Sequence, residues 1–157
     1  MLSEHAKSLI DREVAKYPAD RKQSAVIAAL AIVQEEHGWL SRDLMQDVAE
    51  YLGMAPMAVF EVASFYEMFN LKPMGRHKLT VCTNLPCALS GALDAADHLK
   101  HKLGIGFNEV TADGRFGLRE GQCFGACGDA PVLLVNNTKM HCKMDQAQLD
   151  RLLEDLK

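Results

Sequence analysis

The sequence predicts an α+β fold, in which a helical N-terminal half is followed by a smaller part that mixes strands and helices. Apolar residues recur at helical spacing through residues 1–70, whereas alternating apolar residues bounded by turn signals begin only near residue 77. All five cysteines lie between positions 82 and 142. The two halves are therefore expected to have different structures and different roles, and only the second contains cysteine.

The composition is that of a globular protein. Apolar residues make up 48% of the chain, enough for a core, and charged residues make up 24%, which argues against disorder. The net charge of −4, without a Lys/Arg run, argues against a nucleic-acid partner. The longest apolar run, residues 25–33, is too short for a membrane span of about 20 residues, so no direct membrane insertion is expected.

The N-terminal residues and the cysteine count bear on the compartment. Glu4 and Asp11 lie where a signal or transit peptide would be free of acidic residues, so no targeting segment is expected. Cysteines in a chain without such a segment are expected in a reducing compartment, where disulfides rarely persist. We therefore expect the chain to be soluble and to work where it is made.

Four helices are expected in the first half, at about residues 4–17, 22–37, 42–52 and 56–69. Ser3 and Ser41 are suited to cap the first and third helices, and Pro18, Gly38 and Gly53 are suited to end the first three. The second is apolar on nearly every face, which places it at the centre of a small bundle. On the first helix, the expected inward face consists of Ala6, Leu9, Ile10, Val14 and Tyr17.

A dense apolar patch closes the helical half. It consists of Phe65, Tyr66, Met68 and Phe69. Such a patch is either the seam between two domains or part of a surface that docks a partner protein, and the sequence alone does not choose between them.

Residues 70–75 (Asn-Leu-Lys-Pro-Met-Gly) break the helical period and are expected to link two domains, residues 1–72 and 73–157. Strands are expected at residues 77–83, 116–122, 132–135 and 139–143, with helices at 88–103 and after Asp145. Asn136 and Asn137 are suited to the turn of a hairpin between the last two strands. The order β-α-β-β-β-α favours a small α/β sandwich.

Four cysteines form two pairs, each of which follows an expected strand. Four residues separate Cys82 from Cys87, three separate Cys123 from Cys127, and 35 lie between the pairs. Loops at one edge of a sheet can bring four thiolates together, and four thiolates suit either zinc or an iron–sulfur cluster. The wide spacings favour a 2Fe–2S cluster, because structural zinc usually takes tight C-x2-C pairs.

Other interpretations of the cysteines stay open at this point. They are a zinc-stabilised interaction module, inert buried thiols, and a dithiol redox site that uses Cys123 and Cys127 alone. Cys142 lies on the expected hairpin with no partner, so we expect a buried structural cysteine there.

The residues around the second cysteine pair favour a charged cluster. Gly125, Ala126 and Gly128 are small enough for backbone N–H groups to approach sulfur. Such donors matter because two Fe³⁺, two sulfides and four thiolates sum to a charge of 2−, and reduction makes it 3−. The N-terminus of the helix expected near Ala88 would also stabilise this charge, whereas Asp129 would favour the oxidised form.

At these residues the chain resembles the thioredoxin-like 2Fe–2S subunit of bacterial respiratory complex I, NADH:quinone oxidoreductase, whose mitochondrial counterpart is flavoprotein 2. The family pattern C-x4-C…C-x3-C falls on Cys82, Cys87, Cys123 and Cys127. Further motifs in the same order are F-Y-x-x-F at residues 65–69, K-P-x-G at 72–75, T-N-L-P-C-A-L-S-G at 83–91, G-A-C at 125–127, A-P at 130–131 and V-N at 135–136. The resemblance covers nearly the whole chain.

The resemblance implies a thioredoxin-like C-terminal domain in which those four cysteines bind one 2Fe–2S cluster. It also implies docking onto an NADH- and FMN-binding flavoprotein subunit, with the cluster exchanging electrons with FMN. The complex would hold the chain peripherally, at the cytoplasmic face of the bacterial inner membrane. The chain has no G-x-G-x-x-G fingerprint, so NADH oxidation is expected on the partner.

Two features limit what the resemblance implies. Small subunits of NAD-dependent formate dehydrogenases and NAD-reducing hydrogenases share the same pattern, so they are alternative hosts. Gln122 and Phe124 flank Cys123 where the family pattern leads us to expect an acid and a smaller aliphatic residue. Neither is an expected ligand, so these departures bear only on the local reduction potential.

Overall fold

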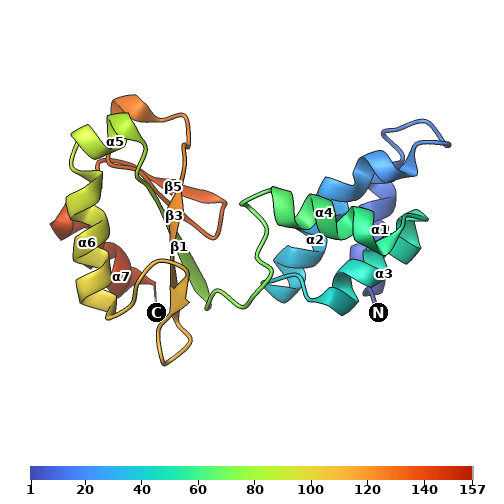
Figure 1. The fold of residues 1–157 in the computed structure, drawn as a ribbon, viewed down its shortest axis with the longest axis horizontal. Helices are drawn as coiled ribbons and strands as arrows, with labels where there is room; N and C mark the ends of the chain where they lie inside the picture. The colour runs from blue at the N-terminus through green and yellow to red at the C-terminus, as the bar shows by residue number, and fades with distance from the viewer. Residues whose placement is uncertain (157) are drawn as a thin grey trace. The chain divides into compact units, whose positions relative to one another are not determined.

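The computed structural model describes residues 1–156, and the chain falls into two compact units, Met1–Pro73 and Met74–Lys157 (Figure 1). The first unit is helical, and the second contains a five-stranded sheet together with helices. The predicted α+β class, with helices first and the sheet second, is confirmed.

The helices of the first unit lie close to the predicted positions, although two of them end early. They are α1 (Glu4–Val14), the 3₁₀ helix η1 (Lys22–Ala25), α2 (Val26–His37), α3 (Arg42–Leu52) and α4 (Pro56–Phe65). Ser3 Oγ accepts a hydrogen bond from the backbone N–H of Ala6 at 2.9 Å, and Ser41 Oγ accepts one from Leu44 at 3.2 Å. Both predicted N-caps are therefore confirmed.

Helix α2 lies at the centre of the helical core, as predicted. Ala29, Leu30 and Val33 of this helix are fully buried. The other helices and their connecting segments contribute further buried side chains, among them Ile10, Leu40, Met45, Val48, Leu52, Val59 and Phe69.

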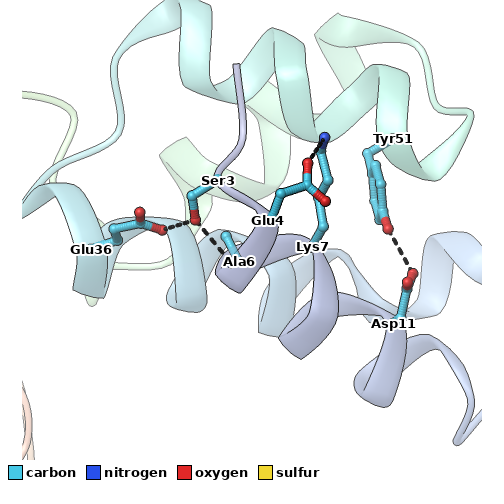
Figure 2. Close-up of polar contacts among 7 residues, drawn as sticks. All are labelled: Ser3, Glu4, Ala6, Lys7, Asp11, Glu36 and Tyr51. Carbon is cyan, nitrogen blue, oxygen red and sulfur yellow. Dashed lines mark hydrogen bonds and ion pairs between the residues drawn. The ribbon is translucent and has the colours of Figure 1, made fainter.

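Polar contacts tie α1 to α2 and α3 at the surface of this unit (Figure 2). Ser3 Oγ donates to Glu36 Oε2 at 2.9 Å, and Tyr51 Oη donates to Asp11 Oδ1 at 2.7 Å. The hydrogen bond to Asp11 raises the pKa of Tyr51, and burial and the negative charges of Asp11 and Glu4 raise it further.

Helix α1 is shorter than predicted. Beyond Val14 the backbone tightens, so that Lys16 N–H donates to the Glu13 carbonyl and Tyr17 N–H to the Val14 carbonyl. This tightening takes Tyr17 off the apolar face, and its side chain is 42% exposed. The prediction that Tyr17 faces the core was wrong.

Helix α4 also ends early, at Phe65 rather than near Phe69. The side chain of Gln34 binds the chain that follows, because its Nε2 donates to the Met68 carbonyl at 2.9 Å and its Oε1 accepts from Asn70 N–H at 2.5 Å. Of the predicted apolar patch, Phe69 is buried in the helical core. Phe65 is 77% exposed.

The second unit is built on a sheet with the strand order β2-β3-β1-β4-β5. The strands are β1 (His77–Cys82), β2 (Glu109–Val110), β3 (Phe116–Gly121), β4 (Leu133–Val135) and β5 (Lys139–His141). β1 runs parallel to β3, and the other neighbouring pairs are antiparallel. Asn136 and Asn137 both have positive φ (51° and 60°) and form the predicted hairpin turn between β4 and β5.

Two elements of this unit differ from the prediction. The helix predicted at residues 88–103 is two helices, α5 (Leu85–Leu89) and α6 (Ala92–Leu103), because Gly91 between them is left-handed at φ 92°. The two-residue strand β2 was not predicted, since two residues are too few to show a period.

Helices α6 and α7 (Gln146–Asp155) cover one face of the sheet (Figure 1). Asp145 caps α7 by accepting from Gln148 N–H at 2.8 Å, as predicted. The core between these helices and the sheet is made of Leu79, Val81, Ala95, Leu99, Leu118, Leu133, Leu149, Leu152 and Leu153, among others. The helices cover this face of the sheet. The two pairs of cysteines follow the carboxyl ends of β1 and β3, at one end of the sheet.

Across residues 1–156, no single helix combines the length and apolar composition required to cross a bilayer. The consecutive helices α3 and α4 meet those criteria only when taken together, and they are bent by 120° at the break between them.

Candidate iron–sulfur site

Both cysteine loops leave the same edge of the sheet. β1 and β3 are parallel neighbours with Cys82 in register with Gly121, so their carboxyl ends lie side by side. Thr83 N–H donates to the Gly121 carbonyl at 3.2 Å, which ties the first loop to the second. In Figure 1, α5 and the short orange turn Cys127–Asp129 lie together at this end of the sheet.

The first pair of cysteines is buried and held by regular structure. Cys82 is the last residue of β1, and its N–H donates to the Val132 carbonyl at 3.1 Å. Asn84 starts α5 by accepting from Leu85 N–H at 2.7 Å, and Cys87 lies within that helix. Both thiols are 2% exposed and pack against Val132 in an apolar cluster.

Burial, a hydrogen bond with Cys82 and the charges of Cys82 and Cys127 together raise the pKa of the Cys87 thiol to about 11. The backbone N–H of Val132 acts in the opposite direction, since it donates to the Cys87 sulfur. Without a metal this thiol is therefore protonated at neutral pH. A metal would have to displace the proton, because the thiolate is the ligand.

The second pair of cysteines is exposed and lies on an irregular loop. Cys123 follows β3, and Cys127 begins the 3₁₀ turn Cys127–Asp129. Gly125, left-handed at φ 71°, directs its N–H to Cys123 Sγ at 3.4 Å. The predicted role of Gly125, bringing a backbone donor to sulfur, is confirmed.

The charge of Asp129 is partly offset by a neighbour that the sequence did not reveal. Lys143 Nζ lies 3.7 Å from Asp129 Oδ1, and Lys143 N–H donates to the Asp129 carbonyl at 2.8 Å. The predicted preference of Asp129 for an oxidised cluster is therefore weakened, although solvent screens this exposed pair.

The donor set fits a two-iron cluster. Cys82 and Cys87 are hydrogen-bonded, and Cys127 lies close enough for its charge to act on Cys87. Within residues 1–156, no three His, Cys, Asp or Glu side chains surround one ion position. A 2Fe–2S cluster needs only two thiolates on each iron. The assignment of all four thiols as ligands stays a prediction.

The expectation for Cys142 was wrong, and two contributors to the site were missed. Cys142 is exposed, because β5 ends at His141 and the chain then turns at Lys143 with a positive φ of 53°. Val132 was missed because its contribution comes from a backbone N–H. Phe124, singled out only as a departure from the family pattern, packs against the apolar cluster that contains the buried thiols.

A family model described as "Thioredoxin-like [2Fe-2S] ferredoxin" matches residues 10–157. The chain belongs to this family. Membership confirms the predicted thioredoxin-like fold of the cysteine-bearing unit and the prediction of a 2Fe–2S protein.

Curated relatives cover most of the chain. An NADH-quinone oxidoreductase subunit of Rhizobium meliloti is 42% identical over 148 residues, which cover 94% of this chain and 86% of the relative. A second NADH-quinone oxidoreductase subunit, from Thermus thermophilus, is 36% identical over 151 residues, which cover 96% and 83%. These relatives are subunits of an oxidoreductase complex.

The fold also matches a solved structure, the NAD⁺-reducing [NiFe]-hydrogenase in its air-oxidised state, with a TM-score of 0.70. The match covers 81% of this chain and 22% of the hydrogenase chain. At 24% sequence identity it supports the fold alone.

Proposed function

We propose that this chain is the electron-transfer subunit of an NADH:quinone oxidoreductase, and that Cys82, Cys87, Cys123 and Cys127 bind its 2Fe–2S cluster. The observation that carries the proposal is the meeting of two cysteine loops at the carboxyl ends of β1 and β3. When bound, such a cluster takes up and returns one electron. The chain itself would supply the four thiolate ligands and backbone N–H groups that donate to sulfur. It would also shield the Cys82 and Cys87 side of the cluster from water.

The two pairs of thiols give this site an inner and an outer side. Cys82, at the end of β1, and Cys87, in α5, are buried, whereas Cys123 and Cys127 are exposed. An electron entering from another protein meets less intervening protein on the exposed side. We infer that the partner, an NADH- and FMN-binding flavoprotein subunit, approaches the loop at residues 122–129.

The relatives favour NADH:quinone oxidoreductase over the alternative hosts. Subunits of that complex are 36% and 42% identical to this chain over more than nine-tenths of its length, whereas the hydrogenase chain is 24% identical. We propose that residues 1–72 and 73–157 act as a helical domain and a cluster domain. We also propose that the assembled complex holds the chain at the cytoplasmic face of the inner membrane.

The cluster is tested on the purified full chain. Anaerobic preparations should be reddish-brown, contain about two irons and two acid-labile sulfides per chain, and give a rhombic electron paramagnetic resonance signal after reduction. Colourless protein with one zinc per chain would contradict the proposal and support a zinc-stabilised interaction module.

The host is tested by purifying the tagged chain from its own cells. We expect a flavoprotein subunit that contains FMN to purify with it, and NADH added to this assembly should reduce the flavin. Co-purification of a formate dehydrogenase or hydrogenase catalytic subunit instead would assign the chain to one of those hosts.

A further inference from the structure

In the sequence Phe124 lies between the two exposed cysteines, but its ring is packed against the rest of the protein. Its side chain is half-buried and packs against the apolar cluster that contains Cys82, Cys87 and Val132. Gln122 and Cys123, the residues before it, are exposed. The ring therefore packs against the cluster that contains the buried thiols, beside Gly121 at the end of β3.

Gly121 provides the space for this ring. A Cβ atom added at Gly121 would lie 2.9 Å from Cε1 of Phe124, closer still to its Cζ, and 3.0 Å from Cγ2 of Thr80. The backbone of Gly121 does not have a positive φ, so its conformation does not require glycine. The position of the Phe124 ring requires glycine at residue 121, because an added Cβ atom would overlap the ring.

Apolar cover has a definite effect on a site whose negative charge grows on reduction. Water stabilises the 3− state more than the 2− state, because the free energy of solvation rises steeply with charge. A ring that excludes water from the buried pair therefore disfavours reduction. It also slows the access of solvent and oxidants to Cys82 and Cys87.

We propose that Phe124, seated in the space left by Gly121, is a positioning residue that shields the Cys82–Cys87 side of the cluster and lowers its reduction potential. The effect on potential rests on the proposed function. The shielding of the two thiols is a property of the protein itself, and it can be measured whether or not iron is bound.

The potential is tested by redox titration of the cluster-loaded full chain, followed by electron paramagnetic resonance. Phe124→Ala should raise the ratio of reduced to oxidised cluster several-fold at a fixed ambient potential, and a tenfold rise corresponds to a shift of about 59 mV for one electron. Phe124→Leu, which keeps part of the apolar cover, should shift the ratio less. Phe60→Leu, on α4 of the helical unit, is the matched control and should not shift it.

The pairing with Gly121 is tested by a double-mutant cycle. Gly121→Ala should displace the ring without removing it, and so shift the ratio in the same direction as Phe124→Ala. In the double variant the two shifts should not add, because no ring is left to displace. Additive shifts, or a Gly121→Ala variant with the parent potential, would refute the pairing.

The shielding is tested in the cluster-free full chain by alkylation and mass spectrometry. Phe124→Ala should speed alkylation of Cys82 and Cys87 several-fold and leave the exposed Cys142 unchanged. If no preparation binds iron, the proposed function fails but this comparison still decides the shielding. If iron binds and neither potential nor alkylation changes, the inference about Phe124 is wrong.

Discussion

The two cysteine loops of the candidate site differ in how the protein holds them. The loop with Cys82 and Cys87 begins in β1 and continues into α5, and both thiols are almost fully buried. The loop with Cys123 and Cys127 is exposed and contains only a three-residue 3₁₀ turn. One side of the site is therefore part of the fold, whereas the other lies on the surface.

This difference indicates how the site would be assembled. Folding alone places the buried pair, because a strand end, a helix and apolar packing fix its backbone. The exposed pair has few such constraints, so a metal cluster would order it. Replacing a buried cysteine should therefore remove the cluster and also destabilise the cluster-free chain. Replacing an exposed cysteine should only remove the cluster.

The largest expected effect is loss of the cluster. Serine in place of Cys82, Cys87, Cys123 or Cys127 should remove most of the bound iron and the visible absorbance, because each thiolate completes the coordination of one iron. Cys142→Ser is the matched control and should keep both. Iron analysis and absorbance of each purified variant provide the measurement, and full iron content in any of the four would remove that residue from the ligand set.

The stability of the cluster-free chain should separate the two pairs. Cys87→Ser buries a hydroxyl in an apolar cluster and should lower the free energy of unfolding by about 1–3 kcal/mol. Cys127→Ser is exposed and should change it by less than about 0.5 kcal/mol. Urea unfolding followed by circular dichroism measures both values. Equal losses would mean that the loops are equally constrained.

The raised pKa of Cys87 should make the stability of the cluster-free chain depend on pH. An unfolded thiol ionises near its ordinary value of 9.0, whereas burial holds the folded thiol protonated up to about 11. Between these values Cys87 binds more protons in the folded state, so its contribution to the free energy of unfolding should fall as pH rises. Lys78, whose pKa burial lowers to about 8, contributes in the opposite direction over much of the same range. The contribution of Cys87 is therefore the difference between the parent chain and a variant that lacks this thiol.

Urea unfolding between pH 8 and about 11 measures this slope. In Cys87→Ala the free energy of unfolding should fall less, or rise more, with pH than in the parent, because no group of raised pKa remains at this position. Cys142→Ala, at an exposed thiol, should leave the slope as it is in the parent. The same slope in the parent and in Cys87→Ala would mean that folding does not raise the pKa of Cys87.

The smallest expected effect concerns Thr80, whose methyl group lies near Gly121 where the two loops meet. Its hydroxyl is buried and has no hydrogen-bond partner within residues 1–156. Thr80→Val should leave the free energy of unfolding unchanged or raise it by up to about 1 kcal/mol, because it removes an unsatisfied polar atom.

Thr83→Val is the matched control for Thr80→Val. Thr83 Oγ1 donates to Glu120 Oε1 at 2.6 Å, so its loss should cost about 0.5–1 kcal/mol. Chemical unfolding of both variants gives the comparison, and a larger loss in Thr80→Val than in Thr83→Val would contradict the assignment.

Local signals in the sequence predicted much of the fold. Ser3, Ser41 and Asp145 were recognisable as helix caps because a short polar side chain satisfies exposed backbone N–H groups wherever such a helix forms. Asn136 and Asn137 predicted the hairpin turn for a similar local reason. Ser90 and Gly91 carried a turn signal that could have divided α5 from α6. That signal was overlooked.

Other features depended on residues distant in the sequence. Gln34, in α2, binds the backbone of Met68 and Asn70, which are 34 and 36 residues away in the sequence and follow the end of α4. Lys143 contacts Asp129 in the loop of the second cysteine pair, and Cys142 beside it is exposed. No periodicity or turn residue predicts such contacts, because they depend on where the two segments lie after folding.

The sequence by itself determined the class of the fold, the family and the four candidate ligands, since residue type and spacing express these directly. Only the tertiary structure decided that one pair of cysteines is buried and the other exposed, and that Phe124 packs against the cluster that contains the buried pair. The physical reason is that burial depends on how β1, β3 and α5 pack together, whereas the spacing of the cysteines is fixed by the sequence alone.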